Sequence, residues 1–389
     1  MLFSLSASVS NGDDWSKWRG PNENGISTET GWNARALSGG AKKLWQRELG
    51  HGYSAVSVKN GRVYAMGNTG KTDIVYCLDA RDGSVIWKHS YPCGPGGFKG
   101  PRATPVNNGD GVYTFSRKGL ALCLDADSGK VRWQTDVAKK TGNAKLRWGY
   151  ASSPVFDGNL LFLNIGEASV ALNKDTGKIV WKSKKGNAGY ASIVLFNWQG
   201  KRCLAIFSGK EFVVAEARTG RRLWSRKWET KYAVNAADPL IAGKKIFVSS
   251  GYDYGCALFD FSGRTPKQIW RNKGLKNHFS SSVYVDEHIY GVDGNSKKHG
   301  FLRCIDIKDG TEKWSMPIGF GSLIAVDNKL VVLDEKGTLH IAEVTPEKYK
   351  ELSKAATGLS KLCWTSPVFS NGIVYCRNDK GTLTAIDVR

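Results

Sequence analysis

Apolar and polar residues alternate in short runs along most of the chain, and one phrase of the pattern recurs. Its cleanest copy runs from Cys123 to Trp133 and reads Cys-Leu-Asp-Ala-Asp-Ser-Gly-Lys-Val-Arg-Trp. Further copies end at Trp87, Trp181, Trp224, Trp270 and Trp314. The gaps between successive final tryptophans are 46, 48, 43, 46 and 44 residues. A repeat of this length indicates a propeller or a solenoid.

Each copy of the phrase predicts a β-hairpin. The apolar run before the Asp is a strand, and the segment that ends in Trp is its partner. Between them, the Asp and Ser/Thr side chains bond nearby backbone amides, and the Gly accepts a positive φ, so the linking residues form a tight turn. We interpret the Trp as a wedge between neighbouring units, because a ring of that size has to be covered by the next unit.

The repeat divides most of the chain into four-stranded units. Units one to six are expected at 52–87, 102–133, 150–181, 190–224, 236–270 and 279–314. Unit seven begins near Gly321 and carries Leu352 where Trp is expected. Within it, Thr345 followed by Pro346 predicts a short helical turn over 344–349.

The last unit is expected to join the two ends of the chain. Three strands between Thr365 and Asp387 lack a fourth, and the strand around Trp45 supplies it. This pairing removes the open edge of a linear stack. We therefore predict an all-β fold: an eight-bladed β-propeller of four-stranded antiparallel blades with tryptophan-docking repeats, closed by N- and C-terminal strands in one blade.

Two segments precede the predicted propeller, which spans 43–389. The lead-in, 15–42, is too aromatic for a tail, so we expect it to pack on the propeller through Trp15 and Trp18. Residues 1–14 resemble the disordered remnant of an export signal, since they end in small residues but lack a basic start. This predicts an exported protein, periplasmic or associated with the cell envelope. No run of 18 apolar residues exists, so no transmembrane segment is expected.

The net charge indicates which partners the chain favours, and the cysteines indicate whether it holds disulfides or a metal. The formal net charge of +21 favours anionic partners, although a basic surface that only keeps the protein soluble gives the same charge. No two of the eight cysteines are adjacent, and Cys77, Cys123 and Cys304 share one repeat position. They are expected to be small buried residues, with no disulfide framework or metal site.

Candidate binding residues come from the loops that link the outer strand of one blade to the inner strand of the next. In a propeller these loops surround a central funnel on one face, and here they combine aromatic with basic or amide side chains. The candidates are His51, Tyr53, Lys99, Arg102, Arg147, Trp148, Tyr150, Tyr190, Tyr232, Asn235, His278 and Trp364. Such a funnel suits a sugar ring or another planar group that carries carboxylate or sulfate.

The same residues could instead have structural roles. Each tyrosine of a Gly-Tyr-Ala or Gly-Tyr-Ser unit could cap the end of its blade. Arg102 and Arg147 could pair with an internal acid instead of a ligand. His51 and His278 could be ordinary polar contacts rather than proton-transfer groups.

The repeat resembles the tryptophan-docking repeat of pyrroloquinoline-quinone-type β-propellers. That superfamily includes quinoprotein alcohol dehydrogenases and the outer-membrane barrel-assembly lipoprotein of Gram-negative bacteria. The lead-in Trp15-x-x-Trp18-Arg19-Gly20-Pro21, with 100–105 and 148–154, resembles the quinoprotein-like proteins of planctomycetes. The resemblance covers 15–389 and implies the fold more strongly than an activity.

The dehydrogenases in this superfamily sandwich the quinone between a Trp and a disulfide of adjacent cysteines. A Glu, an Asn and an Asp hold calcium, and another Asp is the base. This sequence has no adjacent cysteines and no acidic constellation in the inner-strand loops. Pyrroloquinoline quinone with calcium is therefore expected only under an alternative reading.

Our leading hypothesis is an exported, non-catalytic binding or scaffold propeller. Its basic, aromatic funnel would bind an anionic ligand (an acidic glycan or small anion) or a protein partner, with no cofactor, metal or catalytic residue, in a monomer. One alternative is a pyrroloquinoline-quinone-dependent alcohol or sugar dehydrogenase-like enzyme with an atypical site. Another is an outer-membrane assembly-type interaction protein. Lys and Arg are spread over both faces, so specific nucleic-acid binding is not expected.

Overall fold

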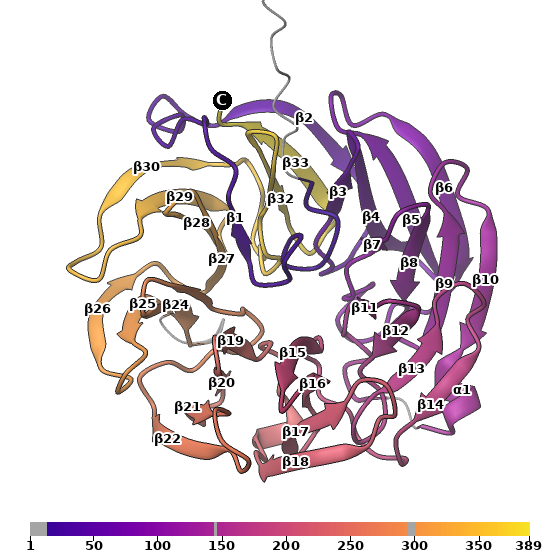
Figure 1. Cartoon of the computed structure of the whole chain (residues 1–389). Coiled ribbons are helices and arrows are strands. Elements are labelled where there is room, and N and C mark those ends of the chain that lie inside the picture. The colour runs from indigo at the N-terminus through magenta and orange to yellow at the C-terminus, as the bar shows by residue number, and fades with distance from the viewer. Residues whose placement is uncertain (1–13, 144–145, 295–299) are drawn as a thin grey trace, which may run out of the picture.

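Eight sheets surround a central axis in the computed structural model of the chain, which describes residues 14–143, 146–294 and 300–389 (Figure 1). Seven sheets have four strands, and the eighth has a fifth strand from the lead-in. The predicted eight-bladed β-propeller is confirmed. The predicted export-signal remnant, apart from Asp14, lies outside the described residues.

The first four blades are consecutive antiparallel meanders, with the inner strand first. Blade 1 is β3 (Ser57–Lys59), β4 (Arg62–Thr69), β5 (Thr72–Asp79) and β6 (Val85–Pro92). Blade 2 is β7 (Val106–Asn107), β8 (Gly111–Phe115), β9 (Leu120–Asp125) and β10 (Val131–Asp136). Blade 3 is β11 (Val155–Asp157), β12 (Leu160–Leu163), β13 (Val170–Asn173) and β14 (Ile179–Lys182). Blade 4 is β15 (Val194–Trp198), β16 (Lys201–Phe207), β17 (Glu211–Glu216) and β18 (Arg222–Lys227).

The next three blades repeat this order. Blade 5 is β19 (Leu240–Ala242), β20 (Lys245–Ser250), β21 (Gly255–Asp260) and β22 (Lys267–Asn272). Blade 6 is β23 (Val283–Val285), β24 (His288–Asp293), β25 (Phe301–Asp306) and β26 (Glu312–Pro317). Blade 7 is β27 (Gly321–Val326), β28 (Lys329–Asp334), β29 (Thr338–Glu343) and β30 (Glu351–Ala356), and β1 (Ile26–Ser27) pairs in parallel with β27.

Blade 8 joins the two ends of the chain. It contains β31 (Val368–Ser370), β32 (Ile373–Arg377), β33 (Thr382–Asp387) and, from the N-terminal side, β2 (Lys42–Glu48). Trp45 lies opposite Ala385 in the antiparallel pairing of β2 with β33. The expected closure is therefore present.

The recurring tryptophans act as the predicted wedges. Trp87 Nε1 donates to the carbonyl of Ala126 in the next blade at 2.9 Å. The same contact to the next blade is made by Trp45, Trp133, Trp181, Trp270 and Trp314. The turn glycine lies under the ring, and a Cβ added at Gly129 would come within 2.6 Å of Trp87. Gly129 also has a φ of 69°, so both space and backbone conformation require glycine there.

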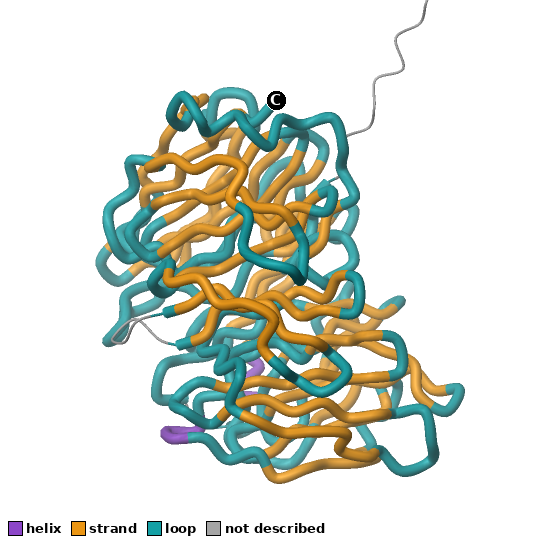
Figure 2. Tube along the Cα trace, turned by 90° about the vertical axis from the view of Figure 1, so that its left-hand side faces the viewer, coloured by secondary structure: helices purple, strands orange, loops and turns teal. Residues whose placement is uncertain are grey.

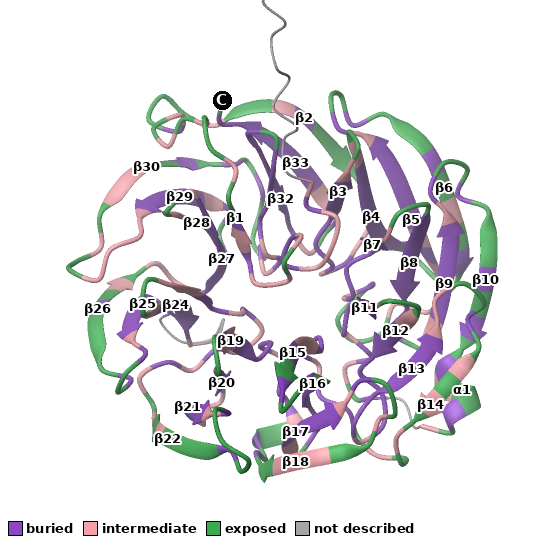
Figure 3. Ribbon diagram, viewed as in Figure 1, coloured by how far each residue is buried: buried purple, intermediate pink, exposed green. Residues whose placement is uncertain are grey.

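The core lies between the blades, as the burial colours of Figure 3 show. Middle strands such as β8 and β28 are buried almost throughout, whereas the outer strand β6 alternates buried and exposed residues. All eight cysteines are buried and unpaired, and the burial of Cys77, Cys123 and Cys304 agrees with their shared repeat position.

The helical content differs from the sequence prediction. Among the described residues it is confined to α1 (Val137–Thr141) and the 3-10 turn η1 (Lys231–Ala233), seen as the two short purple segments in Figure 2. The helical turn predicted over 344–349 is wrong, because these residues form the loop between the paired strands β29 and β30. The wedge Trp314 donates a hydrogen bond to the carbonyl of Thr345 in this loop and packs on Tyr349.

No described helix has the length and apolar character needed to cross a membrane.

The lead-in contacts both sides of the ring of blades. At one end, the carbonyls of Trp15 and Ser16 accept hydrogen bonds from Val58 and Asn107, in blades 1 and 2. Further on, β1 adds to blade 7, and the indigo trace of this segment passes in front of the blades near β27 and β3 in Figure 1. The lead-in is therefore tied to blades that are far apart in the sequence.

Candidate functional site

The top face is defined here as the face whose loops link each outer strand to the next inner strand. Aromatic and basic side chains of these loops, together with Tyr252 from the turn between β20 and β21, form a closed ring of contacts, which we call the aromatic collar. In order of contact its members are Tyr53, Phe98, Trp148, Arg147, Tyr232, Tyr252, His278, Phe279 and Trp364. Tyr53 stacks on Trp364 at 5.7 Å with an interplanar angle of 28°, so the collar joins blade 8 to blade 1.

Arg147 is held in the collar by two rings. Its guanidinium lies 4.9 Å from the Trp148 ring centre and 5.1 Å from that of Tyr232. Within the described part of the chain, this guanidinium has neither a hydrogen-bond acceptor nor a carboxylate partner. Cation–π contacts leave the N–H donors at the edge of the guanidinium free. Arg147 can therefore receive an anion without breaking an internal bond.

Arg102 presents a second positive charge beside Tyr53, 5.7 Å from its ring centre. Its Nη1 donates to Gly100 O at 2.8 Å and its Nη2 to Phe98 O at 3.0 Å. These acceptors are neutral, and no carboxylate in the described ranges pairs with Arg102. Burial, followed by the neighbouring charge of Arg117, lowers the pKa of Arg102 to about 10. An anion bound here would relieve both effects.

The remaining candidates divide into surface and buried positions. Lys99 is exposed, and His51 lies near the carbonyl of Asp379, 3.3 Å from its Nδ1. Tyr190 is half-buried, and burial raises the pKa of its phenol. Tyr150 is 1% exposed and packs on Phe115 inside the blade, which is the capping role weighed above.

Asn235 is fully buried and belongs to a structural network. Its Nδ2 donates to the carbonyls of Ser208 at 3.0 Å and Trp228 at 3.1 Å, and its Oδ1 accepts from Thr230 and Ser250. All its hydrogen-bonding capacity is committed to the junction of blades 4 and 5. The structure does not direct Asn235 into the funnel.

His278 is a collar residue with unused polar atoms. Its ring packs edge-on against Tyr252 at 4.7 Å and lies 4.5 Å from Phe279. Neither Nδ1 nor Nε2 has a hydrogen-bond partner in the described chain. Burial lowers the pKa of His278 to about 4, so the imidazole is neutral at pH 7. Both ring nitrogens are buried, so we assign the neutral ring to the packing of the collar.

Below the collar, side chains at the start of the inner strands link neighbouring blades. The Thr104 amide donates to Ser153 Oγ at 3.0 Å, and the Ser153 amide donates to Ser192 Oγ at 2.9 Å. The Ser192 amide then donates to Asp238 Oδ1 at 2.7 Å. We call Thr104, Ser153, Ser192, Asp238 and Ser281 the hydroxyl belt, although Asp238 contributes a carboxylate in place of a hydroxyl.

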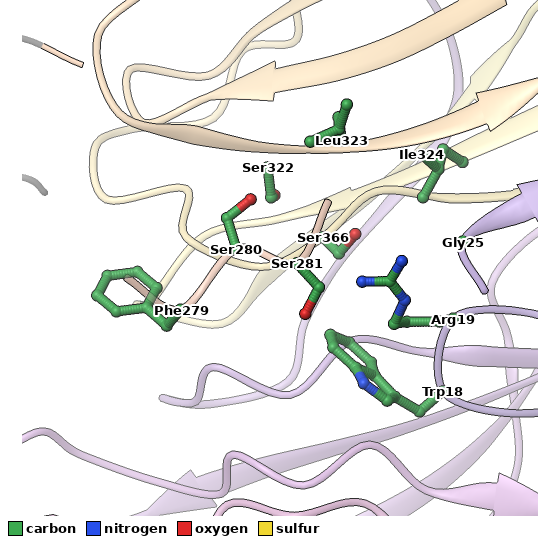
Figure 4. Close-up of a pocket in the computed structure, with 10 residues that line it drawn as sticks. All are labelled: Trp18, Arg19, Gly25, Phe279, Ser280, Ser281, Ser322, Leu323, Ile324 and Ser366. Atoms are coloured by element: carbon green, nitrogen blue, oxygen red, sulfur yellow. The ribbon is translucent and has the colours of Figure 1, made fainter. Parts of the chain in front are cut away.

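The lead-in docks on this one acid of the belt. Trp18 Nε1 donates to Asp238 Oδ2 at 2.6 Å. Arg19 lies close enough for its charge to oppose the rise that burial causes in the Asp238 pKa. Figure 4 shows Trp18 and Arg19 in a pocket with Ser281, Phe279 and other residues. Its free volume of about 10 Å³ is roughly that of a single water. The base of the channel is therefore filled by the protein itself.

The sequence predicts that Trp18 packs on the propeller, but it does not single out several other residues as parts of the site. Phe98, Tyr252 and Phe279 complete the collar, and Asp238 and Arg19 meet Trp18 at the base. A usable signal existed for Asp238: it precedes Pro239 as Thr104 precedes Pro105 and Ser153 precedes Pro154. The other collar aromatics lie in top-face loops, but only their three-dimensional contacts join them.

The quinone and calcium of the dehydrogenase resemblance can be tested against these donors. Calcium takes oxygen ligands, mostly carboxylates and carbonyls. The collar itself consists of aromatic, imidazole and guanidinium side chains, with the carboxylates of Glu335 and Asp379 nearby, and no group of three or more His, Cys, Asp or Glu in the described ranges could hold a metal. The cysteines are separated and unpaired, so no adjacent-cysteine disulfide is present. The donor set here does not fit that quinone–calcium site.

The fold and collar define a class: propellers with tryptophan-docked blades, in which the same architecture serves enzymes and interaction proteins. Among solved structures, the quinohemoprotein alcohol dehydrogenase from Comamonas testosteroni matches with a TM-score of 0.73 and 14% identity, over 97% of this chain and 80% of that one. BamB from Moraxella catarrhalis matches with a TM-score of 0.66 and 15% identity, over 89% and 97%. At these identities the likeness is one of fold.

The sequence comparisons are more specific. A family model described as outer membrane protein assembly factor BamB matches residues 71–316. The outer membrane protein assembly factor BamB of Yersinia pestis is 32% identical over 322 residues, covering 77% of each chain. The chain belongs to the BamB family. A polyvinylalcohol dehydrogenase of a Sphingopyxis species is 27% identical over 272 residues, or 65% of this chain but only 37% of that enzyme.

Proposed function

We propose that this protein is a non-catalytic scaffold of the cell envelope whose top-face funnel binds the anionic groups of an acidic glycan. One observation carries the proposal. Arg102 and Arg147 lie in top-face loops with unused N–H donors, and neither has an ion pair within the described residues. The guanidinium of Arg102 lies over one aromatic ring and that of Arg147 over two. Guanidinium groups bind carboxylate and sulfate through paired hydrogen bonds, and aromatic faces accept sugar rings.

The family supports the envelope setting and a role in assembly. The relatives from Yersinia pestis and Shewanella oneidensis are named as outer membrane protein assembly factors. An outer-membrane assembly role that acts through a protein partner is the less specific form of this proposal. The arginines without an ion pair among the described residues favour the more specific form, because a guanidinium without a carboxylate partner is stabilised by a matching anion.

The test is calorimetric titration of the full chain with a uronate oligomer and, separately, with inorganic sulfate. We expect the double variant Arg102→Ala, Arg147→Ala to bind the uronate at least about tenfold more weakly, since each charge-assisted hydrogen bond contributes about 1.5–3 kcal/mol. The matched control is Arg218→Ala, Arg264→Ala, which removes the same charge from two exposed residues in the turns between β17 and β18 and between β21 and β22. Equal affinities for all three proteins would overturn the proposal.

The dehydrogenase alternative needs its own assay, because dehydrogenases are among the relatives. Titration with pyrroloquinoline quinone, with and without calcium, is combined with dye-linked oxidation of alcohols. We expect no calcium-dependent binding and no oxidation. Tight calcium-dependent binding with turnover would show that the protein is an enzyme.

A further inference from the structure

Two consecutive connections on the top face carry unpaired lysines at their outer ends. The connection from β10 to β11 contains α1, with Lys139 and Lys140 in its last turn. Lys182 is the last residue of β14, and the connection from β14 to β15 that follows it contains Lys184 and Lys185. All five lysines are exposed. We call them the lysine track.

Direct contacts hold the two connections together. The amide of Gly186 donates to Asn143 Oδ1 at 3.0 Å, and Lys182 Nζ lies 3.5 Å from the carbonyl of Lys140. A Cβ added at Gly142 would lie 2.7 Å from Lys185 Cε. The five positive charges are therefore carried by one continuous surface.

Acids on the described surface do not neutralise the track. None of its lysines forms an ion pair with a described residue, whereas Lys210 pairs with Glu229 and Lys273 with Asp253 elsewhere. Asp136 lies next to the track, but its Oδ1 caps α1 by accepting from the Lys139 amide at 2.9 Å. Glu167 is a second carboxylate close to the track, since a Cβ added at Gly186 would lie 2.3 Å from its Cγ. Five lysines without an ion pair among the described residues make this surface positive.

Both connections lead from the rim to the axis. Each starts at an outer strand and ends at an inner strand, and α1 lies at the outer edge of the ring in Figure 1. The first ends at Arg147 and Trp148, and the second at Tyr190. Three strand spacings of about 4.8 Å place the track roughly 14 Å from the inner strands. The lysines and the collar arginine thus mark two ends of one radial path.

We propose that the ligand is an extended polyanionic glycan, with one end at Arg102 and Arg147 and the chain running outward over the lysine track. This inference rests on the proposed function and specifies its ligand as a chain rather than a single anion. A glycan fits better than an acidic peptide because the path ends among aromatic rings. Several weak charge contacts along the track add affinity only for a ligand long enough to reach both ends.

The experiment measures the affinity of the full chain for uronate oligomers of increasing length. We expect the affinity of the unaltered protein to rise by about tenfold or more from the shortest to the longest oligomer. The variant Lys139→Gln, Lys140→Gln, Lys184→Gln, Lys185→Gln should lose this gain but keep the affinity for the shortest. The matched control changes four exposed lysines in turns elsewhere, Lys130, Lys178, Lys244 and Lys308, to Gln. It should behave as the unaltered protein, and thermal melting verifies that each variant is folded.

The outcomes separate the two proposals. Binding that is lost with Arg102→Ala, Arg147→Ala but independent of length would overturn the track and leave the funnel proposal standing. Loss of the length gain in the control variant would also overturn the track, because bulk charge would then explain it. Tighter binding of poly-glutamate than of a uronate of equal charge would assign the path to an acidic protein segment instead. Absence of binding to any uronate contradicts the proposed function itself.

Discussion

The two ends of the central channel use arginine in opposite ways. At the base, Arg19 is buried, donates to the carbonyls of Asn24 and Ser282, and lies near the carboxylate of Asp238. At the top, Arg102 has only neutral acceptors, and Arg147 has only aromatic faces. Arg19 thus has internal acceptors and a nearby carboxylate, although its buried Nε has no partner in the described chain, whereas Arg102 and Arg147 have no carboxylate partner among the described residues. The comparison teaches that an arginine near a propeller axis indicates a ligand only when its internal partners are missing.

The largest expected effect is at the base. Asp238→Ala removes the acceptor of the half-buried Trp18 indole and of the buried Ser192 amide, and it removes the negative charge near the buried Arg19. An unsatisfied buried donor costs about 1–3 kcal/mol, so we expect the free energy of unfolding to fall by about 3 kcal/mol in denaturant titration.

The matched variant Asp238→Ser restores the residue type used at Ser153 and Ser192. It should recover the bond from the Ser192 amide but not both lead-in contacts, and therefore lose about half as much stability. If both variants were as stable as the unaltered protein, the proposed difference would be contradicted: the arginine at the base would be no more dependent on internal partners than those at the funnel.

An intermediate effect is expected from His278. Its folded pKa of about 4 lies below its ordinary value of 6.5, because burial disfavours the charged ring. The unfolded chain therefore binds more protons between these values, and this contribution to stability is fully present above pH 6.5 and lost as the pH falls towards 4. For a half-buried ring we expect about 1–2 kcal/mol.

The measurement compares unfolding of the unaltered protein and His278→Phe across this pH window. Phe keeps the contacts with Tyr252 and Phe279 but cannot titrate, so the unaltered protein should lose stability relative to the variant as the pH falls. A constant difference would contradict the assignment of a buried neutral imidazole to the collar.

The smallest effect on stability is expected at the funnel. Arg102→Ala, Arg147→Ala removes no ion pair with a described residue and relieves repulsion with Arg117. We expect the free energy of unfolding to change by less than about 1 kcal/mol, while uronate binding falls. Thermal melting of the same preparations used for calorimetry provides the test. A loss comparable to that of Asp238→Ala would make these arginines structural.

The sequence predicted the fold well because each blade repeats the same local chemistry. Asp125, Gly129 and Trp133 specify a turn, a positive φ and a wedge in one short stretch, and the copies reinforce one another. The failure at 344–349 has the same origin: Thr345 and Pro346 favour a helix locally, but pairing of β29 with β30 and the Trp314 contact determine the loop.

The site was less accessible to sequence reasoning. Sequence reasoning could place Arg102, Arg147 and Trp148 on the top face from their loops. Tyr150 and Asn235 lie in the same kind of loop, but their side chains turn into the blades. Side-chain direction within a short loop depends on neighbours from other blades. Trp18 and Asp238, 220 residues apart, meet only in the folded molecule.

The closure of blade 8 also governs when the molecule can complete its folding. Strand β2 is among the first made, yet its partner β33 comes last, and the two pair directly. During synthesis β2 therefore has to wait, with an unpaired edge, while seven other blades are produced. Contacts this distant in sequence form slowly, and open strand edges attract other chains in the meantime. The pairing of β2 with β33 closes the finished ring. For the same reason, the growing chain depends on protection from pairing with other chains until β33 is made.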